Sequence, residues 1–266
     1  MQKDYLPIEA DLEEKSEIER VDAFWSSVWQ DLAITSDLVQ KKIEASDEYR
    51  VISDYLSELP AGASFLDGGC GMGEWVNYLH RRGFKPTDLD MSSSTISRLK
   101  KEFPNLQWET GDINKLSHTD KSFDAYISWG TFEHFEAGLS TPISEAYRIL
   151  KPGGFLFITV PQDSLRLFFQ KYHGDWNNTH QDAGKKYAFY QWRLTKREIA
   201  FEVKQQPFII KSIPQIHKTQ GIGRLFTGLT KMNTSGPITA RIVKLLSYYA
   251  GHSRWPYAIC CSPKAI

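Results

Sequence analysis

A glycine-rich turn after Asp67 carries the most specific chemical signal in this chain. The apolar run before it ends at Asp67, and glycines then occupy alternate positions, Gly69, Gly71 and Gly73. Because these positions lack side chains, a ligand can approach the backbone of the turn closely. Such a turn at the carboxyl end of a strand is where open α/β sheets bind nucleotide-like ligands. The sequence therefore predicts a site of that kind here.

The spacing of these glycines separates two kinds of nucleotide site. The fingerprint of dinucleotide-binding proteins requires glycine at the first, third and sixth positions. Counted from Gly69 the sixth position is Glu74, and counted from Gly71 it is Val76. Both counts fail, which argues against a pyrophosphate held at the start of the following helix. A nucleotide-dependent reductase is therefore kept only as an alternative.

Acidic residues stand at the ends of the next two predicted strands. Asp90 lies 17 residues after Gly73 and just before a predicted helix, where a carboxylate can accept hydrogen bonds from both hydroxyls of a ribose. The alternatives are that Asp90 only complements the helix dipole, or that Asp88 takes the ribose instead. Asp112 follows Gly111 at the end of the third strand, and it is either an acceptor for an amine or a simple turn residue.

One of the seven histidines, His134, is placed to act as a base. It comes shortly after the carboxyl end of the fourth predicted strand, next to Glu133. Histidine is the usual general base near neutral pH. The alternative is structural, with His134 and Glu133 orienting the loop. Both readings stay open, because the group that reacts decides whether a base is needed.

Strands and helices alternate from Ser64 onward, which indicates an α/β fold with a doubly wound, mostly parallel sheet of seven strands. The expected strands are 64–67, a short one ending at 90, 106–110, 123–129, 155–160, 208–213 and 255–262. The expected helices between them are 73–81, ended by Gly83, then 93–103 with Ser92 as N-cap, and 141–150 with Thr141 as N-cap. Turn residues at 151–154 precede the fifth strand.

Other segments are expected to cover this sheet. Residues 1–60 are predicted to form an N-terminal helical cap, and residues 61–266 the main domain. In the cap, residues 1–20 are polar and predict no element, while helical spacing of apolar residues marks 21–32 and 47–59. The aromatic stripe of 21–32 is interpreted as core, with a ligand cover as the alternative. Insertions are expected at about 162–192 and 215–251, with a capping box (Thr195, Glu198) opening a helix to 205 and a further helix at 237–249.

Composition limits the class of protein. The 266 residues hold 32 basic and 32 acidic side chains, which argues against nucleic acid as a partner. No secretory signal and no membrane span is expected. Three cysteines form no disulfide framework and fit a reducing cytoplasm. The histidines match no standard metal-ligand spacing, so no metal site is predicted.

The order of these motifs resembles that of class I S-adenosylmethionine-dependent methyltransferases, in their small-molecule branch. The resemblance is close over about 60–160, where Asp90-Met91-Ser92 and the run Arg-Ile-Leu-Lys-Pro-Gly-Gly at 148–154 match family motifs. Gly68 departs from the larger apolar residue usual there. The resemblance implies a Rossmann-like methyltransferase fold, S-adenosyl-L-methionine as cofactor, and methylation of oxygen or nitrogen on a small-molecule acceptor, with the two insertions on the acceptor side.

The resemblance also implies a role for each site residue. The methionine moiety would be held by Asp67 and by the turn of Gly69, Cys70, Gly71 and Gly73. The ribose would meet Asp90 and Met91, and the adenine would meet Asp112 and Ile113. Trp129 would close the site near the sulfur, with His134 nearest the methyl group. Such a transfer needs no covalent nucleophile, so Cys70 is interpreted as a packed turn residue. A non-catalytic module that only binds the cofactor is the second alternative.

Overall fold

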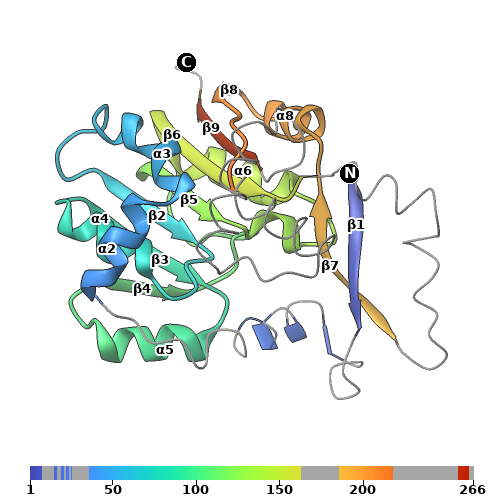
Figure 1. The fold of residues 1–266 in the computed structure, drawn as a ribbon, viewed down its shortest axis with the longest axis horizontal. Coiled ribbons are helices and arrows are strands. Elements are labelled where there is room, and N and C mark those ends of the chain that lie inside the picture. The colour runs from blue at the N-terminus through green and yellow to red at the C-terminus, as the bar shows by residue number, and fades with distance from the viewer. Residues whose placement is uncertain are drawn as a thin grey trace, which may run out of the picture.

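The computed structural model describes residues 1–7, 36–162, 186–217 and 257–263, and residues 15–25 with gaps at 17, 18, 21 and 24. Its centre is a seven-stranded sheet in the order β4-β3-β2-β5-β6-β9-β8 (Figure 1). The strands are β2 (Ser64–Gly68), β3 (Lys85–Asp90), β4 (Gln107–Thr110), β5 (Phe123–Trp129), β6 (Leu150–Val160), β8 (Phe208–Ser212) and β9 (Tyr257–Pro263). Only β9 runs antiparallel to its neighbours β6 and β8. The predicted fold class is confirmed.

Helices cover both faces of this sheet. On one face α2 (Ser36–Glu44), α3 (Asp47–Leu56) and α4 (Glu74–Arg81) pack against a core that includes Phe65 and Phe157. On the other face α6 (Ser140–Ile149) and α8 (Lys196–Lys204) pack against Leu66 and Leu156. The remaining helix, α5 (Ser93–Glu102), lies against β3 and β4. Burial on both faces explains why the central strands read as continuous apolar runs.

Most predicted helix ends are confirmed, and one is wrong. The Ser92 hydroxyl accepts from the Thr95 amide at 3.2 Å, and Thr195 and Glu198 form the predicted capping box. Thr141, in contrast, is not the N-cap of α6, which begins at Ser140 and has Leu139 at its cap position. Leu139 is fully buried, and its carbonyl already accepts from the Ile143 amide at 3.1 Å. Core packing of Leu139 therefore sets the start of the helix.

The fifth predicted strand is longer than expected. Strand β6 begins at Leu150, which pairs with Phe123, and the pairing with β5 then slips before it resumes at Phe155. The predicted turn residues at 151–154 lie inside this irregularity, where Gly153 has a positive φ of 79°. A β-carbon on Gly154 would lie only 2.7 Å from the Asp124 carbonyl oxygen, so the strands approach closely there.

A glycine at position 68 has a packing cause. A β-carbon there would overlap the hydroxyl of Tyr126, whose side chain is fully buried between β2 and the helices of the α6 face. The tyrosine ring takes the space that a larger apolar side chain would need. Gly68 of β2 therefore departs from the family pattern because Tyr126 of β5 fills the space that a larger side chain at position 68 would need.

The N-terminal region contains two elements that the sequence did not predict. Strand β1 (Gln2–Pro7) pairs antiparallel with β7 (Tyr187–Arg193) in a separate two-stranded ribbon, which Figure 1 shows beside the main sheet. Helix α2 was also missed, while the helix expected at 47–59 is present as α3. Of the expected helix 21–32, residues 22, 23 and 25 are helical, and the rest lies outside the described residues.

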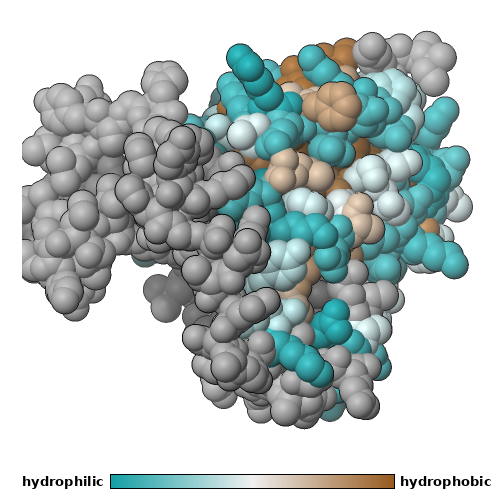
Figure 2. Space-filling model, turned by 90° about the vertical axis from the view of Figure 1, so that its right-hand side faces the viewer, coloured by the Kyte–Doolittle hydropathy of each residue, from teal (hydrophilic) through white to brown (hydrophobic). Residues whose placement is uncertain are grey.

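Most of both predicted insertions, including the helix expected at 237–249, lies outside the described residues. Within the described part, no helix is both long enough and apolar enough to cross a membrane. Figure 2 shows one face whose described surface is mainly hydrophilic, with small hydrophobic areas. Single exposed apolar side chains such as Phe201 and Ile209 are normal on a protein surface.

Candidate functional site

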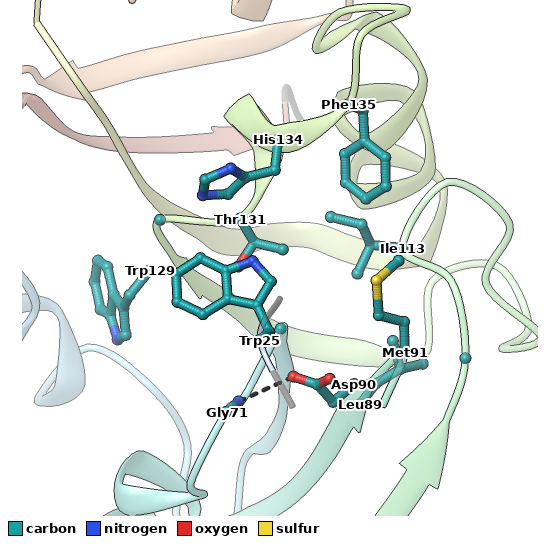
Figure 3. A pocket seen from close by; sticks show the side chains of 13 residues that line it. Trp25, Gly71, Leu89, Asp90, Met91, Ile113, Trp129, Thr131, His134 and Phe135 are labelled. Carbon is teal, nitrogen blue, oxygen red and sulfur yellow. Dashed lines mark hydrogen bonds between the residues drawn. The ribbon is translucent and has the colours of Figure 1, made fainter. Parts of the chain in front are cut away.

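A cavity opens where the carboxyl ends of β2, β3 and β5 meet (Figure 3). Four glycines expose backbone to it, namely Gly69, Gly71, Gly111 and Gly130. Its other walls are mainly apolar, with Leu89, Met91 and Ile113 at the ends of β3 and β4 and Phe135 in the segment after β5.

The glycine turn is fixed to the end of β3 by its own amides. The amides of Gly69 and Cys70 donate to the Leu89 carbonyl at 2.7 and 3.3 Å. The amide of Gly71 donates to the Asp90 carboxylate at 3.0 Å, as the dashed line in Figure 3 shows. Gly69 has a φ of 81°, and a β-carbon there would overlap the Thr131 side chain. This position therefore requires glycine for both its conformation and its space.

Asp90 is the acidic side chain that reaches the cavity. One carboxylate oxygen accepts from the Gly71 amide and the other accepts from the Ser92 amide at 2.9 Å. Burial raises the pKa of Asp90, and these amides act in the opposite direction. Each oxygen keeps lone pairs that could accept from ligand hydroxyls. Asp88, the predicted rival, does not line the cavity and is completely buried.

Three residues assigned to the methionine moiety stand behind the cavity wall. Asp67, Cys70 and Gly73 are not among the residues that line it, whereas Gly69 and Gly71 are. Burial, followed by the charge of Asp90, raises the pKa of Asp67 to about 8. Burial also raises the pKa of the Cys70 thiol, so the thiol stays protonated. This agrees with the interpretation of Cys70 as a packed turn residue.

Asp112 lies beside the cavity with a local partner. Its Oδ1 accepts from the backbone amide of Asn114 at 2.8 Å and from the Asn114 side chain at 2.9 Å. These bonds fit the alternative prediction, in which Asp112 is a simple turn residue. Its neighbours Gly111 and Ile113 line the cavity, and Ile113 faces the same space as Met91. The role of Asp112 at an adenine stays a prediction.

Aromatic side chains, among them Trp129 and Trp25, form another part of the cavity wall. The Trp129 ring packs against Trp75 with centroids 5.3 Å apart, and its buried Nε1–H has no partner among the described residues. Trp25, from the helical part of the N-terminal segment, lies over the cavity in Figure 3. Its ring meets the His134 ring edge to face at 5.3 Å. The ligand-cover alternative for the aromatic stripe is therefore favoured at this residue.

His134 lines the cavity from the short 3₁₀ helix η2 (Phe132–His134). Its Nδ1 lies 2.7 Å from the carbonyl oxygen of Tyr190, a residue of β7. Because a carbonyl only accepts, Nδ1 carries the proton and Nε2 of the neutral ring holds the lone pair. Burial lowers the pKa of His134, while the carbonyls of Tyr190 and Gly130 act to raise it. The ring is therefore neutral near pH 7 and could accept a proton.

Glu133 faces inward beside this histidine, but their side chains do not hydrogen bond to each other. It is only 3% exposed, and its Oε2 has no partner among the described residues. Burial raises the pKa of Glu133 to about 8. The carboxyl group is thus protonated at neutral pH. The structural alternative, in which His134 orients the loop with Glu133, stays open, since the Tyr190 carbonyl holds the His134 ring.

Several lining residues were not identified from sequence, namely Trp25, Leu89, Gly111, Gly130, Thr131 and Phe135. Most of them neighbour a residue that was identified, since they follow the ends of the same strands. Trp25 is the exception, because it comes from a segment far away in the sequence. Among the described residues, no group of three or more potential ligands could hold a metal ion.

Comparisons with known proteins agree with this geometry. Residues 65–154 match the family model described as "Methyltransferase domain". The chain is 31% identical over 123 residues to malonyl-[acyl-carrier protein] O-methyltransferase of Salmonella typhimurium, an alignment that covers 46% of this chain and 48% of the relative. It is 33% identical over 147 residues to fatty-acid O-methyltransferase of Mycolicibacterium smegmatis, covering 53% and 48%. The chain thus spans about half the length of these curated relatives.

A solved structure extends the likeness of the fold to most of the chain. Geranyl diphosphate C-methyltransferase from Streptomyces coelicolor superposes with a TM-score of 0.60 at 14% identity, covering 94% of this chain and 99% of that one. At this identity the likeness concerns the fold alone. Taken with the sheet order and the glycine turn, it shows the class I methyltransferase fold, and residues 65–154 of that fold match the methyltransferase domain model.

Proposed function

We propose that this protein transfers the methyl group of S-adenosylmethionine to an oxygen or nitrogen atom of a small-molecule acceptor. The observation that carries the proposal is one cavity that joins the glycine turn and Asp90 to a neutral histidine, His134. The printed names of the two curated relatives, both O-methyltransferases, support oxygen as the acceptor atom. A cytoplasmic location belongs to the same proposal and fits the three free cysteines.

The residues around the cavity fit this cofactor. Asp90 can accept from ribose hydroxyls, and the apolar side chains of Met91 and Ile113 can flank an adenine ring. The backbone of Gly69 and Gly71 is open to the methionine moiety, with Trp129 near the sulfur. The bound cofactor supplies a methyl group activated by its sulfonium charge. The protein has to align this group with the acceptor and exclude water.

His134 serves the reaction when the acceptor is a hydroxyl. Its Nε2 lone pair takes the acceptor proton, while Tyr190 holds the other ring nitrogen in place. The aromatic rings of Trp25 and Tyr190 fix the ring from two sides, with centroids 5.3 and 5.0 Å away. A carboxylate acceptor carries no proton at neutral pH, so it would not need this base.

The test is methyl transfer from S-adenosylmethionine with an isotope-labelled methyl group. Purified protein is offered fatty acids and malonyl thioesters, the acceptor classes in the relatives' names, and in parallel phenols, sugars and amines. Mass spectrometry of the products is expected to show one labelled methyl group on one of these classes. Cofactor binding without turnover on any acceptor would favour the non-catalytic module instead. Failure to bind the cofactor would refute the proposal.

A further inference from the structure

Three buried carboxyl groups lie on one face of the sheet below the glycine turn. Asp67 and Asp88 are directly paired across the parallel strands β2 and β3, so their side chains point to the same face. Asp90 is two residues beyond Asp88 on the same strand and shares that face. Their exposed fractions are 3%, 0% and 7% respectively. Only Asp90 lines the cavity, and Asp88 lies one step deeper in the sheet.

Asp88 points toward the turn, and its only neighbouring donor among the described residues is the weakly donating Cys70 thiol. Neither of its carboxyl oxygens has a hydrogen-bonding partner of normal geometry among the described residues. The position of a β-carbon on Gly73 would be 3.1 Å from Asp88 Oδ2, so this oxygen sits directly under the end of the turn. The Cys70 thiol lies close enough to act as a weak donor, and the side chain of Trp108 covers the same glycine.

The charges that face this cluster do not balance it. Asp67 and Asp90 are both acidic, the Cys70 thiol is protonated, and the Tyr126 hydroxyl lies toward Asp67 from the far side of β2. Asp22 adds a further negative charge near Asp90. Arg98 of α5 reaches the turn, where its Nη2 lies 2.7 Å from Met72 Sδ. No ion pair joins any of the three carboxyl groups to a described basic side chain.

Such a cluster cannot be fully ionised when it is empty. Burial is the first cause that raises the pKa of Asp88, and the charge of Asp67 adds to it. The same two causes, burial and a neighbouring carboxylate, raise the pKa of Asp67 to about 8. The cluster therefore holds protons at neutral pH, as close carboxyl groups do.

From this arrangement we infer that Asp88 couples the binding of the cationic methyl donor to the release of a proton from the Asp67–Asp88–Asp90 cluster. The inference rests on the proposed use of S-adenosylmethionine. The donor has a sulfonium, an α-ammonium and one carboxylate, so it brings net positive charge to the turn. That charge favours the ionised cluster, and a proton leaves to solvent. The product, S-adenosylhomocysteine, has lost the sulfonium charge and releases fewer protons on binding.

Asp88 does not line the cavity and is therefore a positioning residue that sets the charge state of Asp67 and Asp90. With asparagine at 88 the cluster becomes a pair. The two remaining carboxyl groups then ionise more readily before the donor arrives, so fewer protons are left to release. The affinity of the wild type is expected to rise by about threefold to tenfold per pH unit between pH 6 and 7.5, because linkage of one proton allows at most a tenfold change.

The test is isothermal titration calorimetry of the full chain with S-adenosylmethionine in phosphate and in Tris, two buffers whose heats of ionisation differ. The difference in observed enthalpy gives the number of protons released. We expect on the order of one proton for the donor at pH 7, and clearly less for S-adenosylhomocysteine. On donor binding, Asp88→Asn should release less than half as many protons as the wild type. Asp54→Asn, the same change at an exposed position of α3, should match the wild type.

The outcomes separate this inference from the proposed function. Absence of donor binding would refute the proposed function itself. Donor binding with the same enthalpy in both buffers, equal proton release with donor and product, or wild-type proton release from Asp88→Asn would each overturn the inference alone. If Asp88→Asn does not fold, the pH dependence and the proton count of the wild-type protein still decide it.

Discussion

Replacing Glu133 with glutamine should stabilise this protein, and the gain should depend on pH. Glu133 is almost completely buried beside the site, and burial raises the pKa of its carboxyl group from 4.5 to about 8. In the unfolded chain this group ionises at its ordinary pKa. Between pH 4.5 and 8 the folded protein therefore holds a proton that the unfolded chain has lost, and stability falls as the pH rises through that window. Glutamine has the same shape and does not titrate.

The size of this effect follows from the two pKa values. Each pH unit inside this window lowers the free energy of unfolding by about 1.4 kcal/mol. Between pH 4.5 and pH 7 the wild type therefore loses about 3 kcal/mol of unfolding free energy through Glu133. Glu133→Gln should recover that amount at pH 7 and gain nothing below pH 4.5. The side-chain amide of the introduced glutamine must make its own hydrogen bonds. This adds a contribution to the difference in unfolding free energy that does not vary with pH. In a domain of this size 3 kcal/mol corresponds to roughly 6–12 °C in Tm.

Urea unfolding of both proteins at pH 5, 6, 7 and 8 measures this difference directly. The difference in unfolding free energy between variant and wild type should rise steadily over the series. Asp54→Asn serves as the control, since it neutralises an exposed carboxylate on α3. A constant difference across the four pH values would refute the argument, because it would mean that Glu133 is not held protonated by burial.

Three further predictions concern the site. Asp90→Ala should weaken S-adenosylmethionine binding by more than tenfold in calorimetry, and unchanged affinity would remove its ribose role. Gly69→Ala should cost about 2–4 kcal/mol in urea unfolding, because the methyl group meets Thr131 at a positive φ; a variant as stable as the wild type would contradict the packing found here. His134→Gln should lower kcat by about 10²–10⁴ on a hydroxyl acceptor, and a kcat within twofold of the wild type on such an acceptor would exclude it as the base.

The sheet could be predicted from the sequence because its central strands β5, β6 and β9 are mainly apolar, and Gly68 and Asp90 mark the ends of β2 and β3. Burial on both faces makes such strands easy to identify, and the glycine turn after β2 fixes where the alternation starts. The residues at the carboxyl ends of β3 and β5, Asp90 and Trp129, lie at the cavity for the same reason.

The ribbon of β1 and β7 could not be predicted, since its strands are about 180 residues apart in the sequence and half of the residues of β1 are polar. Asp4 illustrates this: it is buried in the ribbon, where Gln191 and Arg193 of β7 bind it. Helical spacing predicts that the side of the helix bearing Trp25 is covered, but it does not specify whether protein core or a ligand covers it. The position of Asp112 beside Asn114 depends on loop conformation, which the motif alone does not specify.

The most direct test of the central claim is a crystal structure of the protein with S-adenosylhomocysteine. The product is expected in the cavity, with its ribose hydroxyls at the Asp90 carboxylate and its adenine between Met91 and Ile113. Density showing the protein's own side chains filling the cavity beside Gly71 and Asp90, or the product bound elsewhere, would contradict the account.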